Sequence, residues 1–278
     1  MFAKLLKHEW KATSGLLGVF SLAALIAGAV GAVALRFIVR YADSTLTSAI
    51  GGQGGEVETI AASGLAILLA FVMLGLLAYY FGTQIVLLFR FYKHKFTDEG
   101  YLTFTLPVKS HEILAASWLN MLIWTLISMA VVAVALGLMV ICAAGGLSFF
   151  DKEMVDSIVS FYSDIPTEGG EYVALTLASG LLEWLVAPLI AMTCITIGAV
   201  GAKKHKILLA IAVYYGYSMA AGIISTVITA VVTIASYKAD GAFALNVPLI
   251  CGILIQGLVA VVCWFLTNYL VSSKLNLP

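Results

Sequence analysis

Six long segments that are nearly free of charged residues constrain this chain more than any other feature. Five of them contain no Asp, Glu, Lys or Arg, and the sixth, residues 172–202, contains Glu183 alone. Each segment exceeds the roughly 20 apolar residues that cross a hydrocarbon layer about 30 Å thick. We therefore expect six membrane-spanning helices, placed roughly at residues 14–38, 60–89, 113–145, 173–201, 207–236 and 247–272.

The composition excludes most other classes of protein. Hydrophobic residues make up 62% of the 278 residues and charged residues only 11%, whereas soluble domains carry about 25% charge. A formal net charge of zero offers no basic surface for a nucleic-acid backbone. Residues 65–77 and 136–144 are apolar without the alternation that a membrane β-barrel needs. The prediction is an all-α integral membrane protein with a single transmembrane domain over residues 1–278.

The remaining charges are divided unequally between the two sides of the membrane. With six spans, the N-terminus, the second and fourth connections and the C-terminus lie on one side, which carries eleven of the fifteen Lys and Arg residues. Basic residues concentrate on the cytoplasmic side of membrane proteins. The sequence therefore predicts a multi-pass protein of the cell (plasma) membrane with both termini in the cytoplasm.

Residues 1–11 have the pattern of an amphipathic helix. One face collects hydrophobic side chains, including Trp10, and the opposite face collects basic ones, including Lys7. Such a helix lies in the headgroup plane with its lysines toward anionic lipid, so we predict an interfacial elbow helix here. Glu9 projects onto the apolar face. It either compensates the lysines or reaches a basic partner on the cytoplasmic side.

The sequence carries no complete motif for catalysis, nucleotide binding or metal binding. Residues 198–203 (Gly-Ala-Val-Gly-Ala-Lys) have neither the spacing nor the Ser or Thr of a phosphate-binding loop. His111 and Glu112 begin like a zinc-binding motif, but Ala115 stands where the second histidine belongs. We therefore expect no metal site, no catalytic residue and no ATP hydrolysis by this chain alone.

The connection at residues 90–112, between the second and third predicted spans, has the most informative wording. Residues 98–107 read Asp-Glu-Gly-Tyr-Leu-Thr-Phe-Thr-Leu-Pro, and Ser110 and Glu112 follow where a helix N-terminus favours a polar cap and an acid. This wording resembles the first intracellular loop of the permease subunits of ABC-2-type ATP-binding-cassette exporters, in particular those of Gram-positive bacteria. The match runs through Glu99, Gly100, Leu102, Leu106, Pro107, Ser110 and Ile113.

The resemblance implies a permease subunit that moves an amphipathic, peptide, lipid or drug-like substrate. A separate ATPase subunit would bind ATP and Mg, so this chain would hold no cofactor. The permease would form a homodimer, or a heterodimer with a related permease, in contact with membrane lipid. The residues coupled to the ATPase would be Asp98, Glu99, Gly100 and Tyr101, with Leu106 and Pro107 setting the turn into the third span.

Glu183 is the one acidic residue within a predicted span. An ionised acid near mid-bilayer costs on the order of 2.5 kcal/mol or more, so we expect Glu183 to face the interior of the helix bundle or of a dimer. It shares a helical face with Thr176, Gly180 and Ala187, and Pro188 follows. Two roles remain open: a contact in the translocation pathway, or a protonated or hydrogen-bonded structural residue.

Two other functions are compatible with six spans. A secondary transporter would use an ion gradient, but such proteins usually show matching halves with broken helices or intramembrane charges. Here Glu183 is the only acidic residue within the spans, and no repeat is found. A membrane scaffold or sensor would transport nothing. Retention of an ATPase subunit through purification would separate these three functions.

Overall fold

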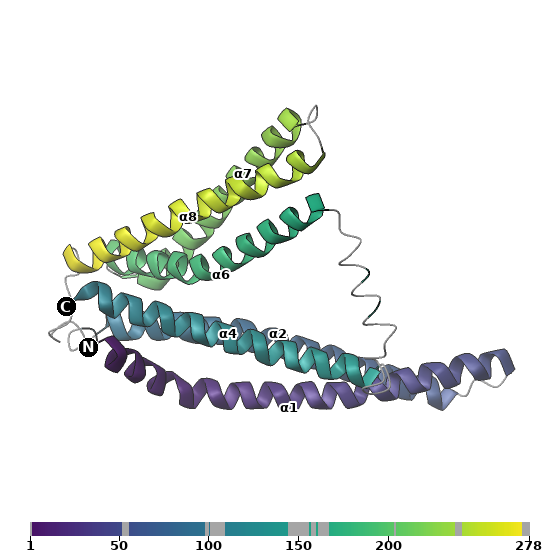
Figure 1. Cartoon of the computed structure of the whole chain (residues 1–278). Helices are drawn as coiled ribbons and strands as arrows, with labels where there is room; N and C mark the ends of the chain where they lie inside the picture. Colours follow the sequence, from purple (N-terminus) through teal and green to yellow (C-terminus); the bar gives the residue numbers. More distant parts are fainter. Residues whose placement is uncertain are drawn as a thin grey trace. The chain divides into compact units, whose positions relative to one another are not determined.

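The computed structural model describes residues 2–51, 56–97, 100, 109–143, 156, 160, 167–202, 204–236 and 241–273. Six long α-helices account for almost all of these residues (Figure 1). They are α1 (Phe2–Gly51), α2 (Glu56–Phe96), α4 (Ser110–Ala143), α6 (Thr167–Gly201), α7 (Lys206–Ser236) and α8 (Gly241–Ser273). Each contains a stretch long and apolar enough to cross a membrane. The prediction of six such helices is confirmed.

Helix α1 is longer than the sequence analysis predicted. Its 50 residues correspond to about 75 Å of helix at 1.5 Å per residue, which is well over the thickness of the hydrocarbon layer. Residues 2–11 form its first turns, with no break before the span expected at 14–38. The segment contains no proline, so nothing in its backbone chemistry interrupts the helix. A separate elbow helix remains a prediction.

The chain divides into two compact units that are described separately. Unit 1 comprises Met1–Glu9, Leu87–Leu122 and Tyr162–Pro278. Unit 2 comprises Trp10–Val86 and Ile123–Phe161. The first turns of α1, the end of α2 and the beginning of α4 thus belong to unit 1 together with α6, α7 and α8.

Unit 2 is held together by small apolar side chains. Its core contains Ala24, Ala32 and Ala135, with larger residues of α2 and α4 around them. A Cβ atom added at Gly28 would lie 2.5 Å from the Cβ of Ala135, and one added at Gly31 would lie 2.5 Å from the terminal methyl of a methionine in α4. Small residues let helix backbones approach closely in membranes, where helices gain no hydrophobic advantage over lipid.

Polar contacts between side chains of different helices also join unit 2, and Thr125 Oγ1 donates to Gln84 Oε1 at 3.2 Å in one of them. Trp124 donates its indole N–H to Thr13 Oγ1 at 2.9 Å and stacks on Trp10 with ring centroids 4.9 Å apart. The hydroxyls of Ser21 and Tyr79 lie 2.8 Å apart. These contacts satisfy polar groups that hydrocarbon would leave without partners.

In unit 1, α6 packs against both α7 and α8 (Figure 1). Many large apolar side chains of α7 and α8 remain exposed, among them Met219, Ile234 and Phe265. Exposed apolar surface of this extent is what a lipid-facing helix presents. The polar contacts of unit 1 include those of the candidate site.

Candidate functional site

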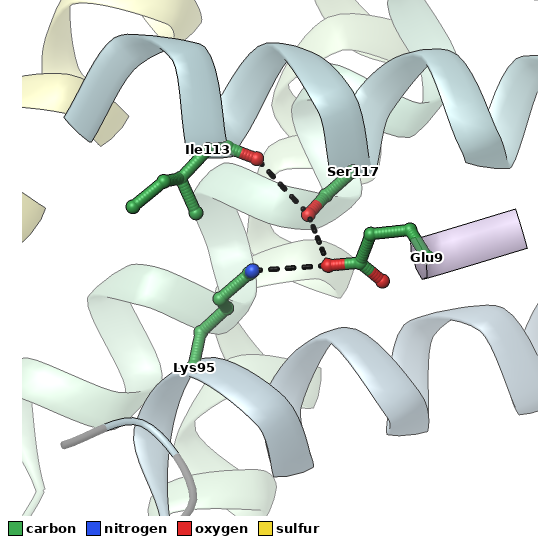
Figure 2. Close-up of polar contacts among 4 residues, drawn as sticks. All are labelled: Glu9, Lys95, Ile113 and Ser117. Atoms are coloured by element: carbon green, nitrogen blue, oxygen red, sulfur yellow. Dashed lines mark hydrogen bonds and ion pairs between the residues drawn. The ribbon is translucent and has the colours of Figure 1, made fainter. Parts of the chain in front are cut away.

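A buried ion pair links the first turns of α1 to the last turn of α2. Lys95 Nζ lies 3.0 Å from Glu9 Oε1, and the side chains are 3% and 15% exposed, respectively (Figure 2). The first alternative for Glu9, compensation of nearby lysines, is thus replaced by the second, a specific basic partner. Whether that partner lies on the cytoplasmic side remains a prediction.

Ser117, in the second turn of α4, brings a third segment to the pair. Its hydroxyl lies 3.2 Å from the carbonyl oxygen of Ile113 and 3.4 Å from Glu9 Oε1 (Figure 2). A hydroxyl has one proton to donate, so the shorter contact within α4 is the stronger one. The carboxylate of Glu9 is therefore held mainly by Lys95, with Ser117 as a weaker second donor.

A small cavity of about 10 Å³ adjoins the ion pair. This volume is close to the minimum that holds one water molecule, so the site has no room for a larger ligand. Besides Glu9, Lys95 and Ser117, its walls come from α2 and α4 and comprise Leu87, Arg90, Phe91, His94, Asn120 and Met121. The cluster brings together side chains from α1, α2 and α4 around this cavity.

The electrostatics of the cluster explain why the pair must be intact. Removing two charges from water costs several kcal/mol per ion, and close contact between the charges offsets much of this cost. If one partner is lost, the other becomes an uncompensated buried charge. Arg90 and His94 add basic groups around the single carboxylate of Glu9, which further favours its ionised form.

The sequence contained a signal for Lys95 that the sequence analysis did not use. Leu87, Phe91 and Lys95 follow at intervals of four, so they share one face of α2, and all three are buried. Lys95 thus continues an apolar face, as Glu9 does in α1. A charge on an apolar helix face indicates that a partner of opposite charge lies nearby. Neither pattern alone identifies which residue that partner is.

The other two residues predicted for the elbow helix, Lys7 and Trp10, lie in different environments. Lys7 is exposed, as expected for the polar face. Trp10 is half-buried and stacks on Trp124 within unit 2. A lipid-facing role for this segment stays a prediction.

Most of the predicted ATPase contact lies outside the described residues. Asp98, Glu99, Tyr101, Leu106 and Pro107 belong to that part of the chain. Gly100 is described: it is buried, and its amide donates to the Thr97 carbonyl oxygen at 2.7 Å.

Helix α4 begins at Ser110, with Glu112 in its first turn, and Lys109 directly precedes the first helical residue. The Lys109 carbonyl oxygen accepts hydrogen bonds from the amides of Glu112 and Ile113, at 2.9 and 3.4 Å. The boundary between the connection and the third span is therefore defined by local backbone bonds.

Glu183 is exposed on α6, together with Thr176, Gly180 and Ala187. The stripe predicted from helical spacing therefore forms one exposed face in the single chain. Its placement in the interior of a bundle or dimer stays a prediction, as does its role in a translocation pathway. Among the described residues, no three His, Cys, Asp or Glu side chains are grouped so that they could hold a metal ion.

Comparisons with known proteins leave the family open. No family model, curated protein or solved structure matches this chain. The functional assignment consequently depends on the sequence of residues 98–107 and on the packing of the helices that flank this segment.

Proposed function

We propose that this chain is the membrane-spanning permease subunit of an ATP-binding-cassette exporter in the plasma membrane. A separate ATPase subunit binds and hydrolyses ATP with Mg, and the permease forms a homodimer or pairs with a related permease. The cargo is amphipathic, as suits a chain whose predicted spans contain almost no formal charge. It belongs to the lipids, peptides or drug-like molecules.

The observation that carries the proposal is the Glu9–Lys95–Ser117 cluster. Lys95 lies in the last turn of α2, just before the chain passes to α4, and Ser117 lies in the second turn of α4. Both side chains contact Glu9. A displacement of the connection by a docked ATPase is therefore passed to the first turns of α1 as well as to α2 and α4. Such coupling lets ATP hydrolysis shift an inward-to-outward equilibrium.

The charge distribution supports the orientation that this proposal requires. An ATPase in the cytoplasm can reach the connection only if residues 90–112 lie on the cytoplasmic side. That side of the predicted topology carries eleven of the fifteen basic residues, as cytoplasmic segments do. Labelling of a single cysteine at Ser110 from outside intact cells checks this orientation, and a labelled site would contradict it.

The direct test of coupling is the substitution Glu99→Ala in the complex with its ATPase, reconstituted in liposomes. We expect cargo-stimulated ATP hydrolysis to fall by at least about tenfold, because a lost hydrogen bond to a charged group costs about 1.5–3 kcal/mol. Asp156→Ala is the matched control, since Asp156 is an exposed acid predicted on the opposite side. Equal hydrolysis in the two variants would remove Glu99 from the ATPase contact.

The driving force separates this proposal from the alternatives. A tagged copy of the chain should retain an ATPase subunit through purification. Transport in liposomes should require ATP on the side of the membrane that carries the ATPase subunit. It should continue when a protonophore is added. Transport abolished by the protonophore alone would indicate a secondary transporter, and a complex that moves no cargo would indicate a scaffold or sensor.

A further inference from the structure

The two halves of α6 are packed differently. Over residues 170–184, which we call the exposed arm, most side chains are exposed, and Leu177 and Leu181 are 65% and 62% exposed. Over residues 185–200, most side chains are buried or half-buried, and Met192 is only 1% exposed. One continuous helix thus carries a loosely packed segment and a tightly packed one.

The packed half of α6 is anchored to both neighbouring helices. Thr193 Oγ1 lies 2.8 Å from Thr267 Oγ1 and 3.3 Å from the Cys263 carbonyl oxygen, both in α8. On the side of α7, a Cβ atom added at Gly198 would lie 2.6 Å from the Cβ of Ala210. Hydrogen bonds and close backbone packing are the forces that join helices in lipid, so this half moves with α7 and α8.

The change in packing occurs next to Pro188. Proline has no N–H, so the carbonyl of Trp184 lacks its usual helical donor. In the same turn, the Leu185 carbonyl oxygen accepts a hydrogen bond from Trp118 Nε1 of α4 at 3.1 Å. The Trp118 ring meets Trp264 of α8 edge-on, with centroids 6.4 Å apart. Trp118 thus holds the carbonyl next to the one that Pro188 leaves without a helical donor.

We propose that Pro188 is the joint about which the exposed arm of α6 pivots, and that Trp118 is the positioning residue that latches the arm through Leu185. With the hydrogen bond made, Glu183 is held in one position relative to the anchored half. With the bond broken, the arm and Glu183 are released. This inference rests on the proposed function, since transport is what a moving Glu183 would serve.

The latch lies close to the proposed coupling site in sequence and in structure. Ser117 and Trp118 are consecutive residues of α4, and they contact Glu9 and Leu185, respectively. Helix α4 begins at Ser110, directly after the connection with the ABC-2-like wording. A shift of the first turns of α4 therefore acts on both contacts at once, and the latch converts it into a movement of the arm.

The test measures the position of the arm directly. Spin labels are placed at Leu177→Cys on the arm and Leu208→Cys on α7, both on exposed side chains, in a background where the four native cysteines are alanine. The distance distribution is measured by pulsed electron paramagnetic resonance in lipid nanodiscs without nucleotide. Trp118→Phe keeps an aromatic side chain at this position and removes the indole N–H that donates to Leu185. We expect a second distance whose population relative to the first rises about threefold, because a hydrogen bond between membrane helices contributes about 0.6 kcal/mol on average.

Two further variants keep the result interpretable. Trp124→Phe is the matched control, because it removes an indole hydrogen bond to Thr13 in unit 2 and should leave the distribution unchanged. Pro188→Ala restores an N–H in the helix, so it should suppress the second distance even when combined with Trp118→Phe. A Trp118→Phe distribution identical to that of the parent overturns the latch, and a second distance that persists with Pro188→Ala overturns the joint.

The measurement also separates this inference from the proposed function. The distance measurement uses no nucleotide and no cargo, so it does not depend on transport. If the arm pivots but the chain never transports with ATP, the joint at Pro188 is supported and the exporter function is contradicted. ATP-driven transport with an unchanged distance distribution in Trp118→Phe would keep the exporter and remove the latch.

Discussion

Helix α1 is held in two different ways along its length. In its first turns, Glu9 is bound by Lys95 at 3.0 Å within unit 1. Further along, Gly28 and Gly31 pack without room for a side chain against α2 and α4 within unit 2. The first contact depends on charge and on one geometry, whereas the second depends only on volume. The same helix therefore combines one contact that a change of charge can break with another that only a change of volume can disturb.

The physical reason lies in what each contact costs to change. A buried ion pair gains little net stability over apolar residues of similar size, but losing one partner is expensive. Close packing of small residues gains dispersion energy with no desolvation cost, and added volume is resisted by the neighbouring backbone. We therefore expect the ion pair to control the position of the helix and the seam to control its stability.

The largest expected effect comes from breaking the ion pair on one side. Lys95→Met leaves Glu9 as a buried carboxylate without its main partner, so the free energy of unfolding should fall by about 3–5 kcal/mol. Denaturant unfolding in mixed micelles, followed by tryptophan fluorescence, measures it. Lys7→Met is the control, because Lys7 is exposed in the neighbouring turn and should change the value by less than about 0.5 kcal/mol.

The double substitution Glu9→Leu with Lys95→Met separates the effect of the ion pair on stability from its effect on the position of the helix. Removing both charges should recover most of the lost stability, since apolar replacements of buried pairs are often neutral. If the pair positions the helix, the recovered protein should still transport poorly. Full recovery of both stability and transport would show that the pair has only a packing role.

A smaller effect is expected when a methyl group is added to the seam. Gly28→Ala places a Cβ atom 2.5 Å from the Ala135 Cβ and 3.1 Å from its Cα, so the helices must separate at a cost of about 1–3 kcal/mol. Gly18→Ala is the matched control on the same helix, because a Cβ there meets nothing within 4 Å. It should be neutral or stabilising by up to about 1 kcal/mol. Equal shifts in unfolding free energy for the two variants would contradict a close-packed seam.

The smallest expected effect concerns a single hydroxyl in unit 2. Tyr79→Phe removes the 2.8 Å contact with Ser21, and hydrogen bonds between membrane helices average only about 0.6 kcal/mol. The same unfolding assay should show a loss of that size, and Ser21→Ala should lose a similar amount without adding to it in the double variant. Additive losses would mean that the two hydroxyls do not act on each other.

The candidate site was predictable in part. Helical spacing placed Glu9 on an apolar face, and this misplaced charge predicted a basic partner without identifying it. Lys95 lies 86 positions away in the sequence, so no local pattern connects the two. Trp118 was not singled out at all, because an indole in an apolar span has no visible partner until α6 is placed beside it.

The ends of the helices show the same division. Helix α4 begins at Ser110 with Glu112 in its first turn, and the residue preferences of a helix N-terminus are local. By contrast, α1 continues through residues that were expected to bound its span. Charge content locates the part of a helix that hydrocarbon accepts, but a helix ends only where its backbone hydrogen bonds end.

By itself, the sequence determined that this chain forms six membrane-length helices, because hydrocarbon cannot solvate charge and the charged residues mark where the chain leaves it. The tertiary structure alone decided which groups meet: Lys95 with Glu9, Trp118 with Leu185, and Gly28 with Ala135. The physical reason is range. Solvation acts on each residue separately and is readable from composition, whereas contacts between helices depend on how distant faces are brought together.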